Sequence, residues 1–121
     1  MKATEAELEI LNVLWALEPA TVREVHDKLI EKKDAGYTTT LKQMQVMLEK
    51  GLVSRVASGK AHVYTALINQ QQAQGQIIQR TVDAFFNGSA MQLVMQALGN
   101  HKASDSELDM IREYLDKRTK K

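Results

Sequence analysis

The segment from residue 38 to residue 50 carries hydroxyl, amide and ammonium groups on one side of a predicted helix. At about 100° per residue, the side opposite the apolar residues holds Thr38, Thr39, Lys42 and Val46, with Gln43 on the flank. In the major groove of DNA, Gln pairs with adenine edges, Lys with guanine or phosphate, and Thr with phosphate or a thymine methyl. These five residues are therefore predicted to contact DNA, with Val46 against a thymine methyl. The same pattern fits equally well a solvated helix face.

Basic residues are concentrated beside this helix, although the whole chain of 121 residues has a formal net charge of only +1. The segment 38–62 contains the single acid Glu49 and four basic residues, Lys42, Lys50, Arg55 and Lys60. A basic segment in a nearly neutral chain indicates a polyanionic partner. Arg55 and Lys60 are accordingly predicted to contact phosphates, although either one taken singly is also an ordinary surface charge.

Three helices are predicted in the N-terminal part of the chain, and the segment 38–50 is the third. A capping box of Thr4 with Glu7 predicts a helix over about 5–17, which Pro19 ends. A second capping box, Thr21 with Glu24, begins a helix that is expected to end near residue 33. Residues 34–36 are predicted to form a turn. The third helix is expected to begin with Thr38 as its N-cap and to end at Gly51.

A β-hairpin is predicted to follow the three helices. Strands are expected over 53–57 and 62–67, joined by a turn at 58–61. Three helices and then a hairpin is the element order of a winged helix-turn-helix domain, which we assign to residues 1–68. The hairpin is then the wing, where Arg55 and Lys60 would lie beside the third helix. Tyr64 and Trp15 are expected to pack in the core.

Residues 69–121 are predicted to form a helical dimerisation domain. The polar run 70–76 begins a fourth helix that ends at 87–88, Ser89 caps a short helix that ends at Gly99, and a capping box of Ser104 with Glu107 begins the last. Residues 117–121 are expected to fray. About fifty residues cannot bury such wide apolar faces alone, so a second copy should cover them. The predicted dimer contacts are Ile78, Val82, Phe85, Phe86, Met91, Val94, Leu98, Leu108, Ile111 and Leu115.

The sequence argues against catalysis, metal binding and membrane insertion. It has no cysteine, which suits a reducing cytoplasm and removes thiolate sites and disulfides. No apolar stretch approaches the roughly 20 residues of a membrane span, and no export signal is visible. His26 and His101 are expected to be solvated and His62 to add charge to the wing; none has a histidine neighbour at helical spacing. No nucleophile with an adjacent base and no cofactor motif is found, so neither an enzyme nor a cofactor is predicted.

Four segments together resemble the penicillinase-repressor (BlaI/MecI) family of bacterial regulators. They are Leu14-Trp15, Tyr37-Thr38-Thr39-Thr40-Leu41, Glu49-Lys50-Gly51-Leu52-Val53 and Val63-Tyr64-Thr65-Ala66-Leu67. The resemblance implies a mainly α winged-helix repressor of the antibiotic-resistance type, a helical dimer domain and an inverted-repeat operator. It also implies release through cleavage triggered by a membrane-bound sensor metalloprotease.

Two positions depart from the pattern of this family. Members commonly have a basic residue where this chain has Val46. The segment matching the cleavage region contains Gln96-Ala97 in place of the usual asparagine-phenylalanine bond, so these two residues are the predicted cleavage position. The copper-responsive relatives have a C-terminal cysteine motif, which this chain lacks.

Two other functions remain open from the sequence. The first is a winged-helix protein-interaction module without operator binding, which the nearly neutral charge and the apolar Val46 would suit. The second is a ligand-gated regulator, although no cluster of polar residues suggests a pocket. The preferred prediction is a dimeric, sequence-specific DNA-binding repressor in the cytoplasm.

Overall fold

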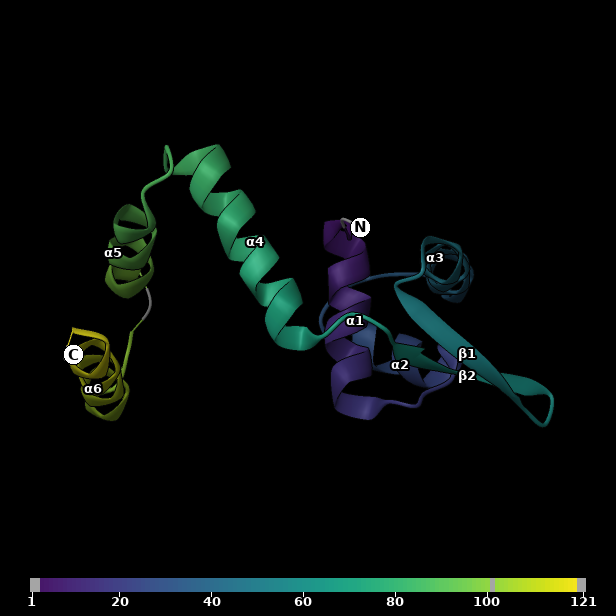
Figure 1. Cartoon of the computed structure of the whole chain (residues 1–121). Coiled ribbons are helices and arrows are strands. Elements are labelled where there is room, and N and C mark those ends of the chain that lie inside the picture. The colour runs from purple at the N-terminus through teal and green to yellow at the C-terminus, as the bar shows by residue number, and fades with distance from the viewer. Residues whose placement is uncertain (1–2, 101, 120–121) are drawn as a thin grey trace. The chain divides into compact units, whose positions relative to one another are not determined.

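The computed structural model describes residues 3–100 and 102–119, which divide into two compact units, one up to Gly75 and one from Gln76. The elements are α1 (Glu5–Leu17), α2 (Val22–Leu29), α3 (Tyr37–Lys50), β1 (Val53–Ser58), β2 (Ala61–Ala66), α4 (Gln70–Phe85), α5 (Ala90–Asn100) and α6 (Asp105–Thr119) (Figure 1). This order confirms the predicted mainly α fold with one small antiparallel hairpin.

Both predicted capping boxes of the first unit are present. The Thr4 hydroxyl accepts from the Glu7 N–H at 3.2 Å, and the Glu7 carboxylate accepts from the Thr4 N–H at 2.8 Å. Thr21 and Glu24 make the same pair of bonds at 3.1 and 2.8 Å. Each box satisfies backbone donors that have no partner inside the helix, so α1 and α2 begin where the sequence predicted.

Two helix boundaries differ from the prediction. The second helix ends at Leu29 and not near residue 33, because the next N–H groups turn back in tighter bonds, from Glu31 to Lys28 and from Lys32 to Leu29. The third helix begins at Tyr37, so Thr38 is not its N-cap. Gly36 holds that position and makes no side-chain cap bond.

A shorter turn than predicted joins the two strands. Val53 pairs with Ala66 and Ser58 with Ala61, which leaves two residues, Gly59 and Lys60, in the turn. Gly59 has a φ of 63°, as the first residue of a two-residue turn of the II′ type requires. The strands therefore extend further into the hairpin than the sequence suggested.

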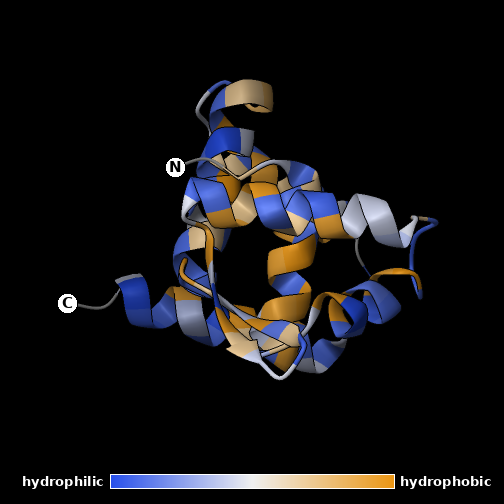
Figure 2. Ribbon diagram, turned by 90° about the vertical axis from the view of Figure 1, so that its right-hand side faces the viewer, coloured by the Kyte–Doolittle hydropathy of each residue, from blue (hydrophilic) through white to orange (hydrophobic). Residues whose placement is uncertain are grey.

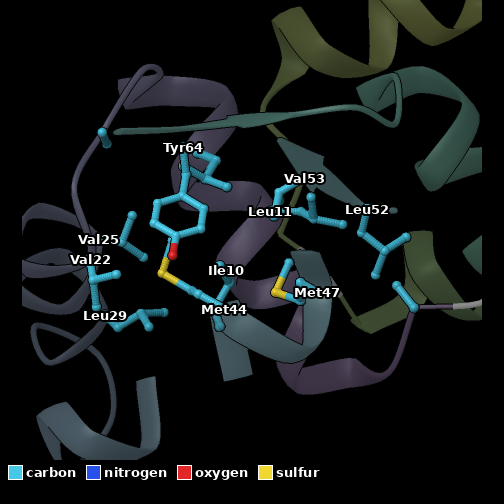
Figure 3. Packing of buried hydrophobic residues seen from close by; sticks show 13 residues of the cluster. Ile10, Leu11, Val22, Val25, Leu29, Met44, Met47, Leu52, Val53 and Tyr64 are labelled. Carbon is cyan, nitrogen blue, oxygen red and sulfur yellow. The ribbon is translucent and has the colours of Figure 1, made fainter. Parts of the chain in front are cut away.

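The first unit has one hydrophobic core, made by α1, α2, α3 and the base of the hairpin. Its fully buried side chains are Ile10, Leu11, Leu14, Val25, Met44, Met47, Val53 and Tyr64. Figure 3 shows the Tyr64 ring among these side chains, with its hydroxyl directed toward Met44 of α3. The core thus joins the hairpin to the third helix, and the predicted core position of Tyr64 is confirmed.

The helices of the second unit keep most of their apolar side chains exposed. Neither α5 nor α6 contains a buried residue, and among the described residues no two of α4, α5 and α6 pack extensively together. Apolar and polar residues nevertheless alternate along the helical ribbons, as in amphipathic helices (Figure 2). The predicted turn after α4 is present, with a φ of 50° at Asn87 and 82° at Gly88.

The predicted C-terminal ends of two helices in this unit differ from the structure. The helix capped by Ser89 continues through Gly99 to Asn100, because a single glycine costs only about 1 kcal/mol in a helix and does not stop it. Residues 117–119, which were expected to fray, are helical and form the last turn of α6. The rest of that tail, residues 120–121, lies outside the described residues.

Candidate nucleic-acid interface

The core determines which side of α3 faces outward. Thr40, Met44 and Met47 are fully buried on one side of the helix. On the other side Thr38 and Lys42 are exposed, and the Val46 side chain is 37% exposed. The helical phase calculated from the sequence therefore agrees with the burial in the structure, and three of the predicted contact residues share one outward face.

Gln43 and Thr39 lie toward one border of this face. Gln43 is partly buried, and both residues line a depression together with Glu9 of α1 and residues 33–36. The middle of the outward face is accordingly formed by Thr38, Lys42 and Val46. We name these three residues the α3 face.

In the wing, Arg55 lies next to the buried residue Tyr64. Arg55 and Tyr64 are directly paired across the two strands, and the Arg55 guanidinium donates to the Tyr64 hydroxyl at 3.2 Å. Arg55 remains exposed, so its other N–H donors are accessible to a phosphate. Lys60 is exposed in the turn, and His62 is exposed on β2.

Hydrogen bonds of the backbone and of two side chains fix the base of the wing to the helical part of the first unit. Ala20, between α1 and α2, exchanges two backbone hydrogen bonds with Tyr64, at 3.1 and 2.7 Å. The Ala66 N–H donates to the Glu18 carboxylate at 2.9 Å, and the Trp15 indole donates to the Ile68 carbonyl at 3.1 Å. The position of Arg55 relative to α3 is thus determined by the core of the unit.

Lys50 has a structural role that the sequence analysis did not detect. Its ammonium donates to both Glu7 carboxylate oxygens, at 2.9 and 2.8 Å, and the Glu7 side chain is only 6% exposed. Burial would raise the pKa of the Glu7 carboxyl, but hydrogen bonds from Lys50 and Thr4 and the Lys50 charge outweigh it and hold the pKa below its ordinary value. Lys50 therefore joins the end of α3 to the start of α1, and it is not part of the basic surface.

His26 was predicted to be solvated, and this prediction is wrong. The residue is only 6% exposed, and its Nδ1 is hydrogen-bonded to the Thr40 hydroxyl at 2.9 Å. The sequence did contain a signal, because His26 follows Val22 by four residues and precedes Leu29 by three. That spacing places it on the inward face of α2. Its burial joins α2 to α3.

The described residues contain no group of three His, Cys, Asp or Glu side chains that could hold a metal ion. Within the same residues, no helix is long and apolar enough to cross a membrane. His101 lies outside the part of the chain that the structure describes.

The predicted dimer contacts differ in exposure. Phe86, Leu108 and Ile111 are partly buried, and Val82 is buried within the chain itself. The exposed members are Ile78, Phe85, Met91, Val94, Leu98 and Leu115. Gln96 and Ala97, the predicted cleavage position, are both exposed on α5.

Comparison with known proteins identifies relatives that match most of the chain. The sequence profile described as penicillinase repressor matches residues 3–117. The methicillin resistance regulatory protein MecI of Staphylococcus aureus is 20% identical over 115 residues, which are 95% of this chain and 94% of that protein. The transcriptional regulator BlaI of Mycobacterium tuberculosis is 36% identical over 61 residues, or 50% of this chain, and this match spans only 44% of the length of that relative.

A solved structure has the same fold. The solution structure of the Bacillus licheniformis BlaI monomeric form, in complex with the blaP half-operator, superimposes with a TM-score of 0.52 at 24% sequence identity. The match covers 59% of this chain and 87% of that chain. The winged-helix fold predicted from the sequence is thereby confirmed.

Proposed function

Because this chain belongs to the penicillinase repressor family, a family of repressors and not of enzymes, we propose that it represses transcription by binding operator DNA as a homodimer. The observation that carries the proposal is the α3 face, whose polar and apolar groups point outward from a helix held by the core on its other side. A rigid helix with such a face fits the major groove.

Each group on this surface has a distinct role in the proposed complex. Lys42 binds a guanine edge or a phosphate, Thr38 binds a phosphate, and Val46 contacts a thymine methyl. Arg55, held by Tyr64, and Lys60 at the tip of the wing contact the phosphates beside the groove. Thr39 and Gln43 contribute from the border of the α3 face.

The exposed apolar side chains of the second unit support the proposed dimer. Large apolar residues scattered singly are normal on a surface, but here they recur along α4, α5 and α6, as Phe85, Met91 and Leu115 illustrate. A second copy of the chain would cover them. A twofold dimer presents two recognition helices related by symmetry, so its operator would be an inverted repeat.

Inactivation by proteolysis in the cytoplasm completes the proposal. Gln96 and Ala97 are exposed on α5, where a protease controlled by a membrane-bound sensor could reach them after local unfolding of the helix. Cutting there would separate α6 from the rest of the second unit. The dimer would lose part of its interface, and its affinity for two half-sites would fall.

The experiment that tests this function is selection from randomised duplexes at low salt, followed by fluorescence anisotropy across a salt series. We expect the protein to select an inverted repeat and its affinity to fall steeply with salt. Selection of no sequence would overturn the repressor proposal and favour a protein-interaction module, since such a scaffold binds all duplexes weakly.

A charge-matched pair of variants locates the surface. Lys42→Ala should weaken operator binding by about tenfold and lower the salt slope by about 1, because one phosphate-neutralising charge is lost. Lys32→Ala removes the same charge from a groove between α1 and α2 and should leave affinity nearly unchanged. Equal effects of the two substitutions would show that the α3 face is not the reading surface.

A further inference from the structure

The start of α3 is held by side chains from α2 and not by a cap of its own. Its N-cap, Gly36, accepts no backbone N–H through a side chain. The first turn of a helix frays easily when its N–H groups lack partners. In this protein two residues of that turn, Tyr37 and Thr40, are instead in contact with α2.

The first contact is a buried hydrogen bond. His26 Nδ1 and the Thr40 hydroxyl lie 2.9 Å apart, and their residues are only 6% and 1% exposed. The Thr40 hydroxyl also lies 3.5 Å from the Gly36 carbonyl oxygen, so one side chain joins α2, the N-cap and the first turn. A hydrogen bond is stronger in such a water-poor site and, unlike an apolar contact, it requires one orientation of its partners.

The second contact fixes the ring of Tyr37 from two sides. The rings of Tyr37 and His26 are in a T-shaped arrangement, with their centroids 5.5 Å apart and an angle of 82° between their planes. The Arg23 guanidinium lies over the same ring, 4.2 Å from its centroid. Both arrangements are favourable for an aromatic ring, so Tyr37 is held between two side chains of α2.

We propose that His26 is a positioning residue for DNA recognition, which acts through Tyr37 and Thr40. These two residues directly flank Thr38 and Thr39, whose side chains are exposed. Holding the flanking residues fixes the direction in which the two hydroxyls point. The inference rests on the proposed function, because it assigns His26 the orientation of a DNA-reading turn.

The test compares substitutions that remove the bond without leaving a buried polar group unpaired. In the double variant H26L/T40V both partners become apolar, so the melting temperature should change little. Loss of one buried hydrogen bond should lower affinity for the selected operator by about five- to tenfold. The preference for operator over shuffled DNA should fall by the same factor, and the Thr40 amide, which donates to the Gly36 carbonyl at 3.2 Å, should exchange hydrogen faster.

Two further variants keep the result interpretable. T40S retains the hydroxyl and should restore the affinity and selectivity that T40V loses. T81V makes the same Thr→Val change and removes a hydrogen bond of similar length, from the Thr81 hydroxyl to the Ile77 carbonyl at 2.8 Å, within α4. It should leave selectivity unchanged.

The outcomes separate this inference from the function on which it rests. Wild-type selectivity and amide exchange in both H26L/T40V and T40V would overturn the positioning role. A loss of melting temperature with unchanged selectivity of the folded fraction would overturn it too, because the bond would then be only structural. A wild-type protein that fails to prefer operator over shuffled DNA would overturn the proposed function instead.

Discussion

Both units of this chain contain amphipathic helices, but the apolar sides of these helices are buried in the first unit and exposed in the second. In the first unit the apolar sides of α1, α2 and α3 meet the base of the hairpin and become inaccessible, as for Leu11 and Leu14. In the second unit the apolar sides remain exposed, and Phe85 keeps 80% of its accessible surface. The pattern of apolar residues is helical in both cases, but only the first unit covers its own apolar surface.

Under the proposed function, this difference would assign recognition to the first unit and assembly to the second. A unit with its own core can hold an α3 face and a wing in a fixed geometry without any partner. A unit whose apolar side chains are exposed gains stability when a second copy covers them, so its folding depends on protein concentration. Measurements of stability and association on variants of each unit test whether the two units differ in this way.

The largest effect is expected from a cavity in the first unit. Leu14→Ala should lower the free energy of unfolding by about 3 kcal/mol, because a fully buried leucine is truncated. Urea denaturation at two protein concentrations should give the same loss. Leu67→Ala is the matched control, since Leu67 is exposed at the end of the hairpin and its truncation should change stability by less than about 0.5 kcal/mol. A loss that grows on dilution would contradict an independent core.

The second largest effect is expected on dimerisation, which depends on protein concentration. Phe85→Asp puts a charge on the most exposed large apolar side chain of α4, and it should raise the dimer dissociation constant by about thirtyfold, or about 2 kcal/mol. Sedimentation velocity over a dilution series measures this change. Gln72→Asp adds the same charge to an exposed polar position of α4 and should leave dimerisation unchanged. A monomeric wild-type protein at all concentrations would remove the basis of the comparison.

The third effect concerns an ion pair inside the first unit. Glu7→Gln should cost about 2 kcal/mol near neutral pH, because Lys50 loses its partner in a half-buried site. Since the folded pKa of Glu7 lies below its ordinary value of 4.5, the stabilisation is present above pH 4.5 and disappears as the pH falls through the folded pKa. Urea denaturation from pH 7 to pH 3 should therefore show the two proteins converging at the acid end.

The control for this ion pair is a second one with similar geometry. Glu9 accepts from the Lys33 ammonium at 2.9 Å, but its side chain is 46% exposed. Glu9→Gln should cost less than about 1 kcal/mol at any pH, because water screens an exposed pair. A pH-dependent loss in Glu9→Gln equal to that in Glu7→Gln would show that burial does not decide the strength of the pair.

Local signals in the sequence predicted most of this fold. The capping boxes at Thr4, Thr21 and Ser104 each mark the start of a helix in the structure, because their bonds join residues three apart. The burial of one side of α3 also follows from spacing alone. Both features depend on geometry within one helix, which a sequence specifies directly.

Features that depend on distant residues were not predicted. Lys50 reaches Glu7 across 43 positions, and Arg55 reaches Tyr64 because the two lie in register across the hairpin. His26 was misjudged because histidine is usually near the surface, although its spacing on α2 pointed inward. The proposed dimer contacts of the second unit also depend on distant residues, those of a second copy, which spacing within one helix does not specify.

The smallest effects are expected from substitutions at the helix caps of the two units. Thr38, a threonine that is not a cap, serves as the comparison. Thr21→Ala and Ser104→Ala each remove a hydroxyl that accepts a backbone N–H at 3.1 Å, and each should cost about 1 kcal/mol. In the first unit the loss should not vary with protein concentration, whereas in the second it should also weaken the dimer. Thr38→Ala should change stability by less than about 0.5 kcal/mol, because Thr38 is exposed and α3 begins without it, but it should weaken operator binding. If Thr38→Ala lost about 1 kcal/mol of stability, as the two cap variants should, Thr38 would be the N-cap of α3, as the sequence predicted.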